Sequence, residues 1–294
     1  MPKLFLAILL AGVLSFLVPA VQDCVRQAIQ RRHGLIWATP LLLTGVFGVA
    51  AAVAGAFRVE LILLVLAYTA APLACLWLAK AREFGEPGFV TDFLAILVLW
   101  LPLEFGAGAW LIPRPAQGFL HSVAYGVAIL LGLVLFIGFR DLKGMKYNPP
   151  RSGRDLWLPL VAFAITAPVL IAVGVAIGFI PPPHLPTAPA GRMAAGAGLI
   201  LAGTALPEEI LFRSLIQNII MQKWGGGNGA LFAASLIFGC AHLNNGPQPM
   251  PNWRYMILAT IAGFAYGKVF HKSSTVVSSA VLHTLVDWTK HFVF

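Results

Sequence analysis

Two adjacent glutamates and an arginine lie within the apolar stretch LPEEILFRSLIQ, residues 206–217. Burying a charged side chain in hydrocarbon costs several kcal/mol unless the charge is paired or faces water. Glu209 and Arg213 have the i, i+4 spacing, so on a helix they lie on one face and can form an ion pair. Glu208 points about 100° away from that face. We therefore interpret Glu209 and Arg213 as structural support and Glu208 as a carboxylate available for chemistry.

Three further ionisable residues lie in apolar surroundings: His242, His283 and Asp287. Ionisable residues within membrane helices are functional candidates, because placing them there is costly. Asp287 lies one helical turn after His283, so it can accept a hydrogen bond from a ring nitrogen and orient the imidazole. Together with Glu208 they bring an acid and two imidazoles, groups that accept and donate protons. This set predicts one buried site.

Each of these features also has a simpler interpretation. Pro207 and the two glutamates could begin a helix, with proline at its first position and acids in its first turn. His242 could cap a helix or lie at the membrane interface, and His283 with Asp287 could form an interfacial pair. We favour a shared site, because the simpler interpretation has to account for every case separately.

The composition indicates the class of protein that carries these residues. Of the 294 residues, 59% are hydrophobic and 11% are charged, whereas soluble domains carry about 25% charged residues. Mean hydropathy is +0.84. The three cysteines have no CxxC spacing and indicate neither a disulfide framework nor a metal knot. The net charge of +9 is not concentrated on a soluble segment, so we expect no nucleic-acid partner.

Apolar runs about 20 residues long predict membrane-spanning helices. The first run could be a signal peptide, but only Lys3 precedes it and no clear cleavage site follows, so we keep it as a span. At about 1.5 Å per residue, Glu208, His242 and His283 would lie roughly 15–21 Å from the cytoplasmic face, in one layer. The ten predicted spans are residues 4–21, 35–57, 59–79, 89–112, 119–139, 156–180, 193–221, 229–242, 254–270 and 273–290.

Basic residues in the short connections predict the orientation of these spans. The odd-numbered connections hold thirteen Lys and Arg residues, among them Lys80 and Arg82, and the even-numbered ones hold four. Positive residues favour the cytoplasmic side, so both termini are expected on the opposite side. The fold class is therefore an all-α, polytopic transmembrane helix bundle of about ten spans, with the site buried between C-terminal helices. We expect it in the cytoplasmic membrane of a prokaryote.

The longest polar, basic stretch is RDLKGMKYNPPRSGRDLW, residues 140–157. Its Pro-Pro pair indicates a linker, so we expect an N-terminal membrane region, residues 1–150, and a C-terminal region, residues 151–294. The candidate site lies in the second region. The Pro-rich residues 180–192 predict an external loop without regular structure. We find no internal repeat.

At these residues the chain resembles the CAAX prenyl endopeptidase and bacteriocin-processing (CPBP, or ABI) family of intramembrane proteases. The first family motif, a Glu-Glu pair, three residues and an arginine, matches EEILFR. The second, a phenylalanine, three residues and a histidine, matches Phe238 and His242. The third, a histidine, three residues and an asparagine or related polar residue, matches His283 and Asp287. The stretch AGFAYGKVF, residues 262–270, resembles the small-residue helix between the last two motifs. The resemblance covers residues 151–294, and the first five spans carry no family signature.

The resemblance implies a mechanism for the C-terminal region. Glu208 and His242 would hold and activate a water for attack on a peptide carbonyl. Glu209, Arg213 and Phe238 would be structural support, and His283 with residue 287 would stabilise the oxyanion. Asp287 departs from the pattern, because asparagine donates through its amide whereas an ionised aspartate only accepts. Asp287 would therefore be protonated, or act by favouring a charged His283.

The resemblance implies an intramembrane endopeptidase that acts on a membrane-anchored peptide or protein in the lipid bilayer, with prenylated CAAX-type tails among the candidate substrates. A proton-coupled transporter is a weaker alternative, since transporters usually contain repeated halves. A non-catalytic immunity or scaffold protein is another alternative. We expect no cofactor. The alternative is zinc, with Glu208, His242 and His283 as ligands.

Overall fold

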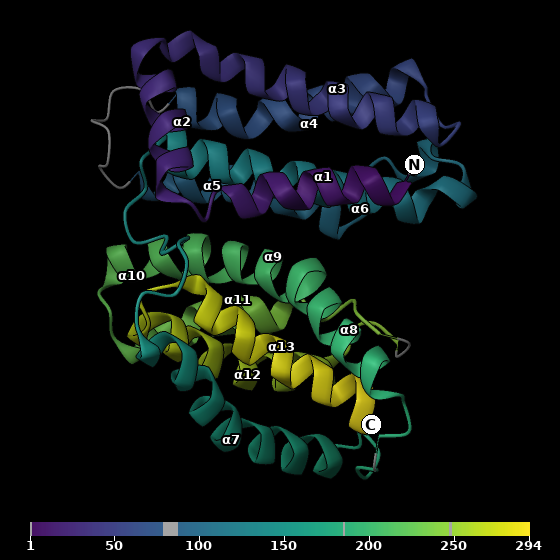
Figure 1. Ribbon diagram of the computed structural model, residues 1–294, viewed down its shortest axis with the longest axis vertical. Helices are drawn as coiled ribbons and strands as arrows, with labels where there is room; N and C mark the ends of the chain where they lie inside the picture. Colours follow the sequence, from purple (N-terminus) through teal and green to yellow (C-terminus); the bar gives the residue numbers. More distant parts are fainter. Residues whose placement is uncertain (1, 79–87, 185, 247–248) are drawn as a thin grey trace. The chain divides into compact units, whose positions relative to one another are not determined.

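The computed structural model describes residues 2–78, 88–184, 186–246 and 249–294, and within them it contains helices and no strand. The prediction of an all-α chain is confirmed for these residues. Residues 79, Lys80 and Arg82, which we assign to the end of a span and a cytoplasmic connection, lie outside them. The chain divides into two compact units, Met1–Lys143 and Gly144–Phe294, which are described separately (Figure 1). Their boundary lies within the polar stretch 140–157.

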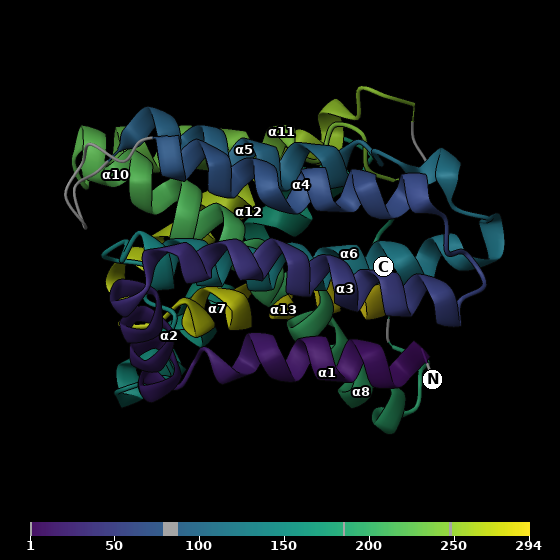
Figure 2. The same cartoon turned by 90° about the horizontal axis from the view of Figure 1, so that it is seen from above.

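The first unit consists of helices whose core is formed by small and aliphatic side chains. Helix α3 packs against α4 and α6, and α1 packs against α6 (Figures 1 and 2). The elements are α1 (Pro2–Ser15), α2 (Pro19–Arg31), the 3-10 helix η1 (His33–Trp37), α3 (Ala38–Val53), α4 (Val59–Leu78), α5 (Phe89–Glu104), the 3-10 helix η2 (Ala109–Leu111), α6 (Arg114–Leu133) and the π-helix η3 (Val134–Phe139).

The first predicted span is not a single straight helix. Helices α1 and α2 are bent by 87° at the break between Ser15 and Pro19. Val18 has an extended backbone, with φ −83° and ψ 117°, because the ring of a following proline disfavours the helical conformation. Residues 4–21 therefore span both helices, as a broken span or a re-entrant segment.

A buried ion pair joins α5 to the end of η3 in the first unit. Arg140 follows η3, and its Nε and Nη2 donate to the two carboxylate oxygens of Asp92 at 2.8 and 2.9 Å. Both side chains are buried. A bidentate pair of this kind satisfies both charges at once, so it can hold the start of α5 against the end of η3 away from water.

The second unit contains all of the predicted site residues. Its elements are α7 (Gly153–Ala176), α8 (Ala190–Ile200), the π-helix η4 (Leu201–Ala205), α9 (Leu206–Glu209), the π-helix η5 (Ile210–Gln217), α10 (Asn218–Trp224), α11 (Asn228–Cys240), α12 (Trp253–Lys272) and α13 (Val276–Val293). Helix α12 packs against α7, α11 and α13, so helices from three parts of the sequence surround it.

Residues 190–224 form one continuous helical stretch in which the hydrogen-bonding pattern switches twice from α-helical to π-helical and back. Pro207 has no N–H, and its ring clashes with the preceding turn, so a regular α-helix is disrupted there. The π-helical segments η4 and η5 flank this position and accommodate the disruption. Ala205 before it is helical, with φ −64° and ψ −50°, so Pro207 does not begin a separate helix.

Glycines allow α12 to approach its neighbours closely. A Cβ on Gly239 of α11 would lie 2.0 Å from Thr260 Oγ1, and one on Gly263 would lie 2.8 Å from a ring carbon of Phe238. A Cβ on Gly267 would lie 2.4 Å from Gln217 Oε1. Small residues serve this purpose between membrane helices, where close packing is the main source of association.

The segment that precedes α7 is anchored on the turn between α12 and α13. Lys146 Nζ donates to three carbonyl oxygens of residues 270, 271 and 273, at 2.8, 3.2 and 2.9 Å. Asp155 accepts from Ser274 N at 2.8 Å and from Ser274 Oγ at 2.6 Å. Burial lowers the pKa of Lys146 from its ordinary value, and the Asp155 carboxylate opposes that shift. These contacts fix where α13 begins.

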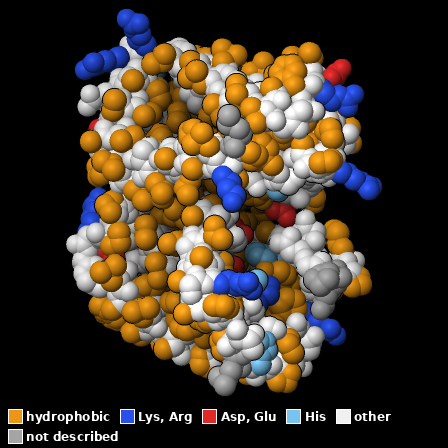
Figure 3. Space-filling model, turned by 45° about the vertical axis from the view of Figure 1, so that its right-hand side comes forward, with side chains coloured by type: hydrophobic (Ala, Val, Ile, Leu, Met, Phe, Trp, Pro, Cys, Tyr) orange, Lys and Arg blue, Asp and Glu red, His pale blue; other side chains and the backbone are white. Residues whose placement is uncertain are grey.

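Four described helices are long and apolar enough to cross a membrane, at His33–Val53, Val59–Leu78, Arg114–Phe139 and Gly153–Ala176, and the bent pair α1–α2 would be a fifth. The chain is therefore a multi-pass membrane protein. Helices are present at the other predicted spans, but α11, for example, has only 13 residues, so the count of ten spans stays a prediction. Hydrophobic side chains cover much of the surface in Figure 3, and Leu42, Ile165 and Leu199 are among those exposed.

Candidate active site

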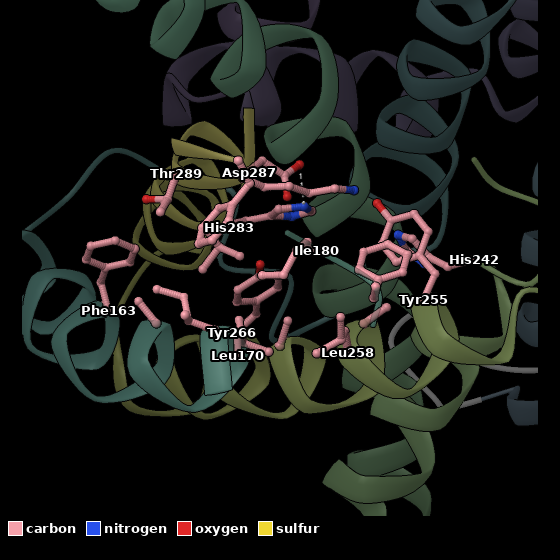
Figure 4. Close-up of a pocket in the computed structure, with 18 of the residues that line it drawn as sticks. Phe163, Leu170, Ile180, His242, Tyr255, Leu258, Tyr266, His283, Asp287 and Thr289 are labelled. Carbon is pink, nitrogen blue, oxygen red and sulfur yellow. Dashed lines mark ion pairs between the residues drawn. The ribbon is translucent and has the colours of Figure 1, made fainter. Parts of the chain in front are cut away.

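A pocket in the second unit is lined by apolar side chains of α7 and α12, by His242 beyond the end of α11, and by polar residues of α12 and α13. It encloses a cavity of about 80 Å³. A cavity needs roughly 10–15 Å³ of this kind of volume to hold one water, so the space admits several. Figure 4 shows His283 and Asp287 at one side of the pocket and His242 with Tyr255 at the other.

His242 lies just beyond the C-terminal end of α11, and its side chain is fixed by its own helix. Its Nδ1 lies 2.8 Å from the carbonyl oxygen of Phe238. A carbonyl oxygen only accepts, so Nδ1 carries the hydrogen in the neutral ring and the lone pair is on Nε2. The ring also contacts Tyr255 edge to face, with centroids 4.6 Å apart. The arrangement keeps Nε2 able to accept a proton.

His283 is surrounded by carboxylates. Its Nδ1 lies 3.1 Å from Glu209 Oε1, and its Nε2 lies 3.4 Å from Asp287 Oδ2 and 3.8 Å from Glu208 Oε2. The Tyr266 ring stacks on the imidazole, with centroids 4.6 Å apart and planes 21° apart. Because both ring nitrogens face carboxylate oxygens, the geometry suits a doubly protonated imidazolium.

The Glu209–Arg213 pair lies next to His283, and both side chains of the pair are fully buried. Arg213 Nε donates to Glu209 Oε2 at 3.0 Å, and the Ser279 hydroxyl donates to the same oxygen. The guanidinium also stacks over the Phe238 ring, with its carbon 4.8 Å from the centroid. Glu209 therefore joins the arginine to His283, a second contact that its spacing to Arg213 does not indicate.

The predicted residues fall into two groups. Glu208, Glu209 and Asp287 each contact His283 through the ion pairs above. His242 stands apart from them across the pocket (Figure 4). Phe238 lies between the groups, with its ring centroid 4.8 Å from that of His242 and 5.8 Å from that of His283. Its aromatic contacts fit the supporting part that we assign to it.

Among the residues at the site that the sequence reasoning missed are Tyr255, Tyr266 and Ser279. Ser279 precedes His283 by one helical turn, so the same i, i+4 rule that relates His283 to Asp287 could have found it. Tyr266 lies within the stretch 262–270, whose small residues indicate close helix packing but do not single out the tyrosine. No comparable signal marks Tyr255.

The residues expected of a zinc site do not form a metal-binding cluster. Among the described residues, no group of three or more His, Cys, Asp and Glu side chains is arranged to hold a metal ion. Glu208 and His283 are neighbours, but His242, the third expected ligand, belongs to the other group.

Comparison with known proteins gives one match. Residues 190–289 match the family model described as Rce1-like, Type II CAAX prenyl endopeptidase Rce1-like, about a third of the chain. The predicted resemblance is confirmed over that region, which contains all three motifs. No curated protein and no solved structure gave a significant match.

Proposed function

We propose that this chain, a member of the Rce1-like CAAX protease family through residues 190–289, is an intramembrane endopeptidase. It would hydrolyse a peptide bond of a membrane-anchored substrate with a water activated by Glu208 and His242. The observation that carries the proposal is the pocket that His242, His283 and Asp287 line together, in apolar surroundings and with space for water.

Water activation is assigned to the two groups that can accept a proton. His242 Nε2 has a free lone pair, because Nδ1 is committed to the Phe238 carbonyl. Glu208 is a carboxylate whose side chain is 29% exposed, unlike its buried neighbour. In this proposal a water that binds between these groups loses one proton to one of them as its oxygen attacks the peptide carbonyl carbon. The product of this step is a tetrahedral oxyanion.

In the second step the base gives up the proton that it took from the water. The carbon–nitrogen bond breaks, the electron pair leaves with the nitrogen, and the protonated base delivers its proton to the departing amine. The other product keeps the attacking oxygen as a carboxyl group. No external oxidant or reductant is required, and the base returns to its starting state.

His283 is assigned the task of stabilising negative charge. With Glu209 at one nitrogen and Asp287 at the other, the ring is held in place and favoured as a cation. A fixed positive charge in a site with little water lowers the energy of an oxyanion far more than it would in bulk solvent. Asp287 acts in this scheme through His283.

The surroundings of the site support the proposed substrate class. The pocket is lined mostly by apolar residues of α7 and α12, such as Phe163, Leu170 and Leu258 (Figure 4). A peptide held at the membrane by a hydrophobic anchor suits this lining, and prenylated CAAX-type tails are one candidate. The proposal includes a catalytic core of residues 151–294, an N-terminal region of unassigned role, about ten spans and the cytoplasmic membrane of a prokaryote as location.

The test is reconstitution of the full chain in liposomes with a panel of membrane-anchored peptides, prenylated and unprenylated, followed by mass spectrometry of the products. We expect a single internal cleavage by the parent and none by Glu208→Gln, with both proteins equally folded. Cleavage by neither protein on any peptide, or equal cleavage by both, would refute the proposal. Metal content of the active protein distinguishes the zinc alternative.

A further inference from the structure

Hydrolysis at this site needs a hydrogen-bond donor for the oxyanion, and the acidic residues do not supply one. An ionised carboxylate only accepts hydrogen bonds. The Nδ1 of His283 is directed at Glu209, and its Nε2 lies close to Asp287 and Glu208. The imidazole thus provides charge, while both of its N–H groups already face carboxylates.

Tyr266, whose ring stacks directly on His283, carries an uncommitted hydroxyl. Its ring on α12 is 1% exposed, stacks on His283 and lines the pocket. Figure 4 shows it in the middle of the pocket-lining residues, with the hydroxyl oxygen on the side of the ring towards His283 and Asp287. Its hydroxyl makes no hydrogen bond to any group in the part of the chain that the structure describes.

Tyr266 is held in position by contacts with Ser279 and Arg213. Ser279 Oγ lies 3.0 Å from the Tyr266 carbonyl oxygen and also donates to Glu209. The serine hydroxyl thus lies between the tyrosine backbone and the carboxylate that contacts His283, and its single hydrogen is donated to one of the two at a time. Arg213 adds a cation–π contact, with its guanidinium carbon 5.9 Å from the tyrosine ring centroid. A donor fixed before the reaction stabilises a transition state without reorganisation.

We propose that Tyr266 is a catalytic residue whose phenol donates a hydrogen bond to the substrate carbonyl oxygen as negative charge develops on it. The phenol keeps its proton throughout, so the bonds made and broken are those of the hydrolysis. His283 supplies the positive charge and Tyr266 supplies the hydrogen bond. This inference rests on the proposed endopeptidase function.

The test is Tyr266→Phe in the full-length protein reconstituted in liposomes. Phenylalanine keeps the ring that stacks on His283 and removes only the hydroxyl. Loss of one oxyanion donor lowers kcat about a hundred- to a thousand-fold in other acyl-transfer sites, so we expect a fall of that size with KM little changed. Tyr68→Phe in the first unit, whose hydroxyl donates to Leu99 O, is the control and should retain kcat within about twofold.

A second measurement separates catalysis from packing. A peptide phosphonate mimics the tetrahedral oxyanion, so its affinity should fall in Tyr266→Phe by the factor lost from kcat, while the uncleaved peptide amide binds as before. An unchanged kcat, or equal losses for phosphonate and amide together with a lower unfolding temperature, overturns the assignment. If the parent itself cleaves no peptide, the endopeptidase function fails and this assignment fails with it. If Tyr266→Phe cleaves peptide like the parent, only the catalytic role of Tyr266 is overturned, and the endopeptidase function stands.

Discussion

Glu208 and Glu209 are neighbours in the chain and have different environments. Glu209 is fully buried between Arg213, Ser279 and His283, whereas the Glu208 side chain is 29% exposed and lies 3.8 Å from His283 Nε2. A carboxylate that satisfies three partners is part of the framework, and a partly exposed carboxylate is available to exchange protons. The two residues should therefore fail in different ways when substituted.

We expect Glu209→Gln to lower stability, because the change leaves Arg213 buried without a carboxylate. Breaking one partner of a buried ion pair costs on the order of 3–5 kcal/mol. Thermal unfolding in detergent and the yield of folded protein measure the loss, and Glu208→Gln is the matched control, with near-parent stability and no turnover. Equal behaviour of the two variants in both assays would contradict a structural role for Glu209 and a catalytic role for Glu208.

Asp287 has two possible roles, and the geometry around it favours one of them. Its Oδ2 faces His283 Nε2 at 3.4 Å, as expected of a carboxylate that orients and charges the ring. Asp287→Asn should therefore reduce turnover, because it removes the charge that favours the imidazolium, and Asp287→Ala should reduce it further. Steady-state kinetics across pH measures both variants. An asparagine variant as active as the parent would instead make residue 287 a direct donor to the oxyanion.

At the scale of elements, the helical stretch of residues 190–224 decides where the acidic residues point. Pro207 is followed directly by the two glutamates, and the π-helical segment η5 then carries Arg213 and Gln217. Inserted π-turns rotate the residues that follow them relative to a regular α-helix, and they occur often at functional sites. The irregular backbone thus coincides with residues to which we assign catalytic and supporting roles.

Helix α12 needs its glycines to reach η5. Gln217 Nε2 donates to the Gly267 carbonyl at 3.0 Å, and a Cβ on Gly267 would lie 2.4 Å from Gln217 Oε1 and from Leu231 Cδ1. We expect Gly267→Ala to destabilise the protein by about 1–3 kcal/mol, the usual cost of an overpacked interior. Thermal unfolding in detergent measures this change.

The control for this substitution is Gly198→Ala in α8, where an added Cβ would meet no atom within 4 Å. Alanine is a better helix former than glycine, so this variant should be at least as stable as the parent. If Gly267→Ala were equally stable, the close approach of α12 would not depend on glycine.

At the scale of the whole molecule, the predicted orientation can be tested across α7. This helix is long and apolar enough to cross the membrane and separates Lys143 from His184. We expect Lys143→Cys, in a protein lacking its three native cysteines, to react with a membrane-impermeant maleimide only after cells are opened. His184→Cys should react in intact cells, because the basic residues place the preceding connection in the cytoplasm.

Each labelling pattern has a defined meaning. The reverse pattern would show that the orientation is inverted. Reaction of both positions from the same side would show that α7 does not cross the membrane, and the count of spans would then be wrong. Folded protein and equal labelling after solubilisation are the controls.

The amino-acid sequence by itself determined the class of protein, the positions of most apolar helices and the identity of most ionisable residues at the candidate site, but not the break between α1 and α2. Hydropathy is a property of a continuous segment, and the i, i+4 relation of Glu209 to Arg213 and of His283 to Asp287 is a property of one helix. Both can be read without knowing which helices meet. The family motifs are local for the same reason.

Only the tertiary structure decided what meets across the second unit. His283 contacts Glu209, which is 74 residues away, and Tyr266 stacks on His283 from a third helix. Such contacts depend on which helix faces pack together, and hydropathy cannot rank those faces when nearly every residue around them is apolar. The π-helical segments around Pro207 have the same origin, since a proline permits several backbone distortions and the packing of the surrounding helices selects one.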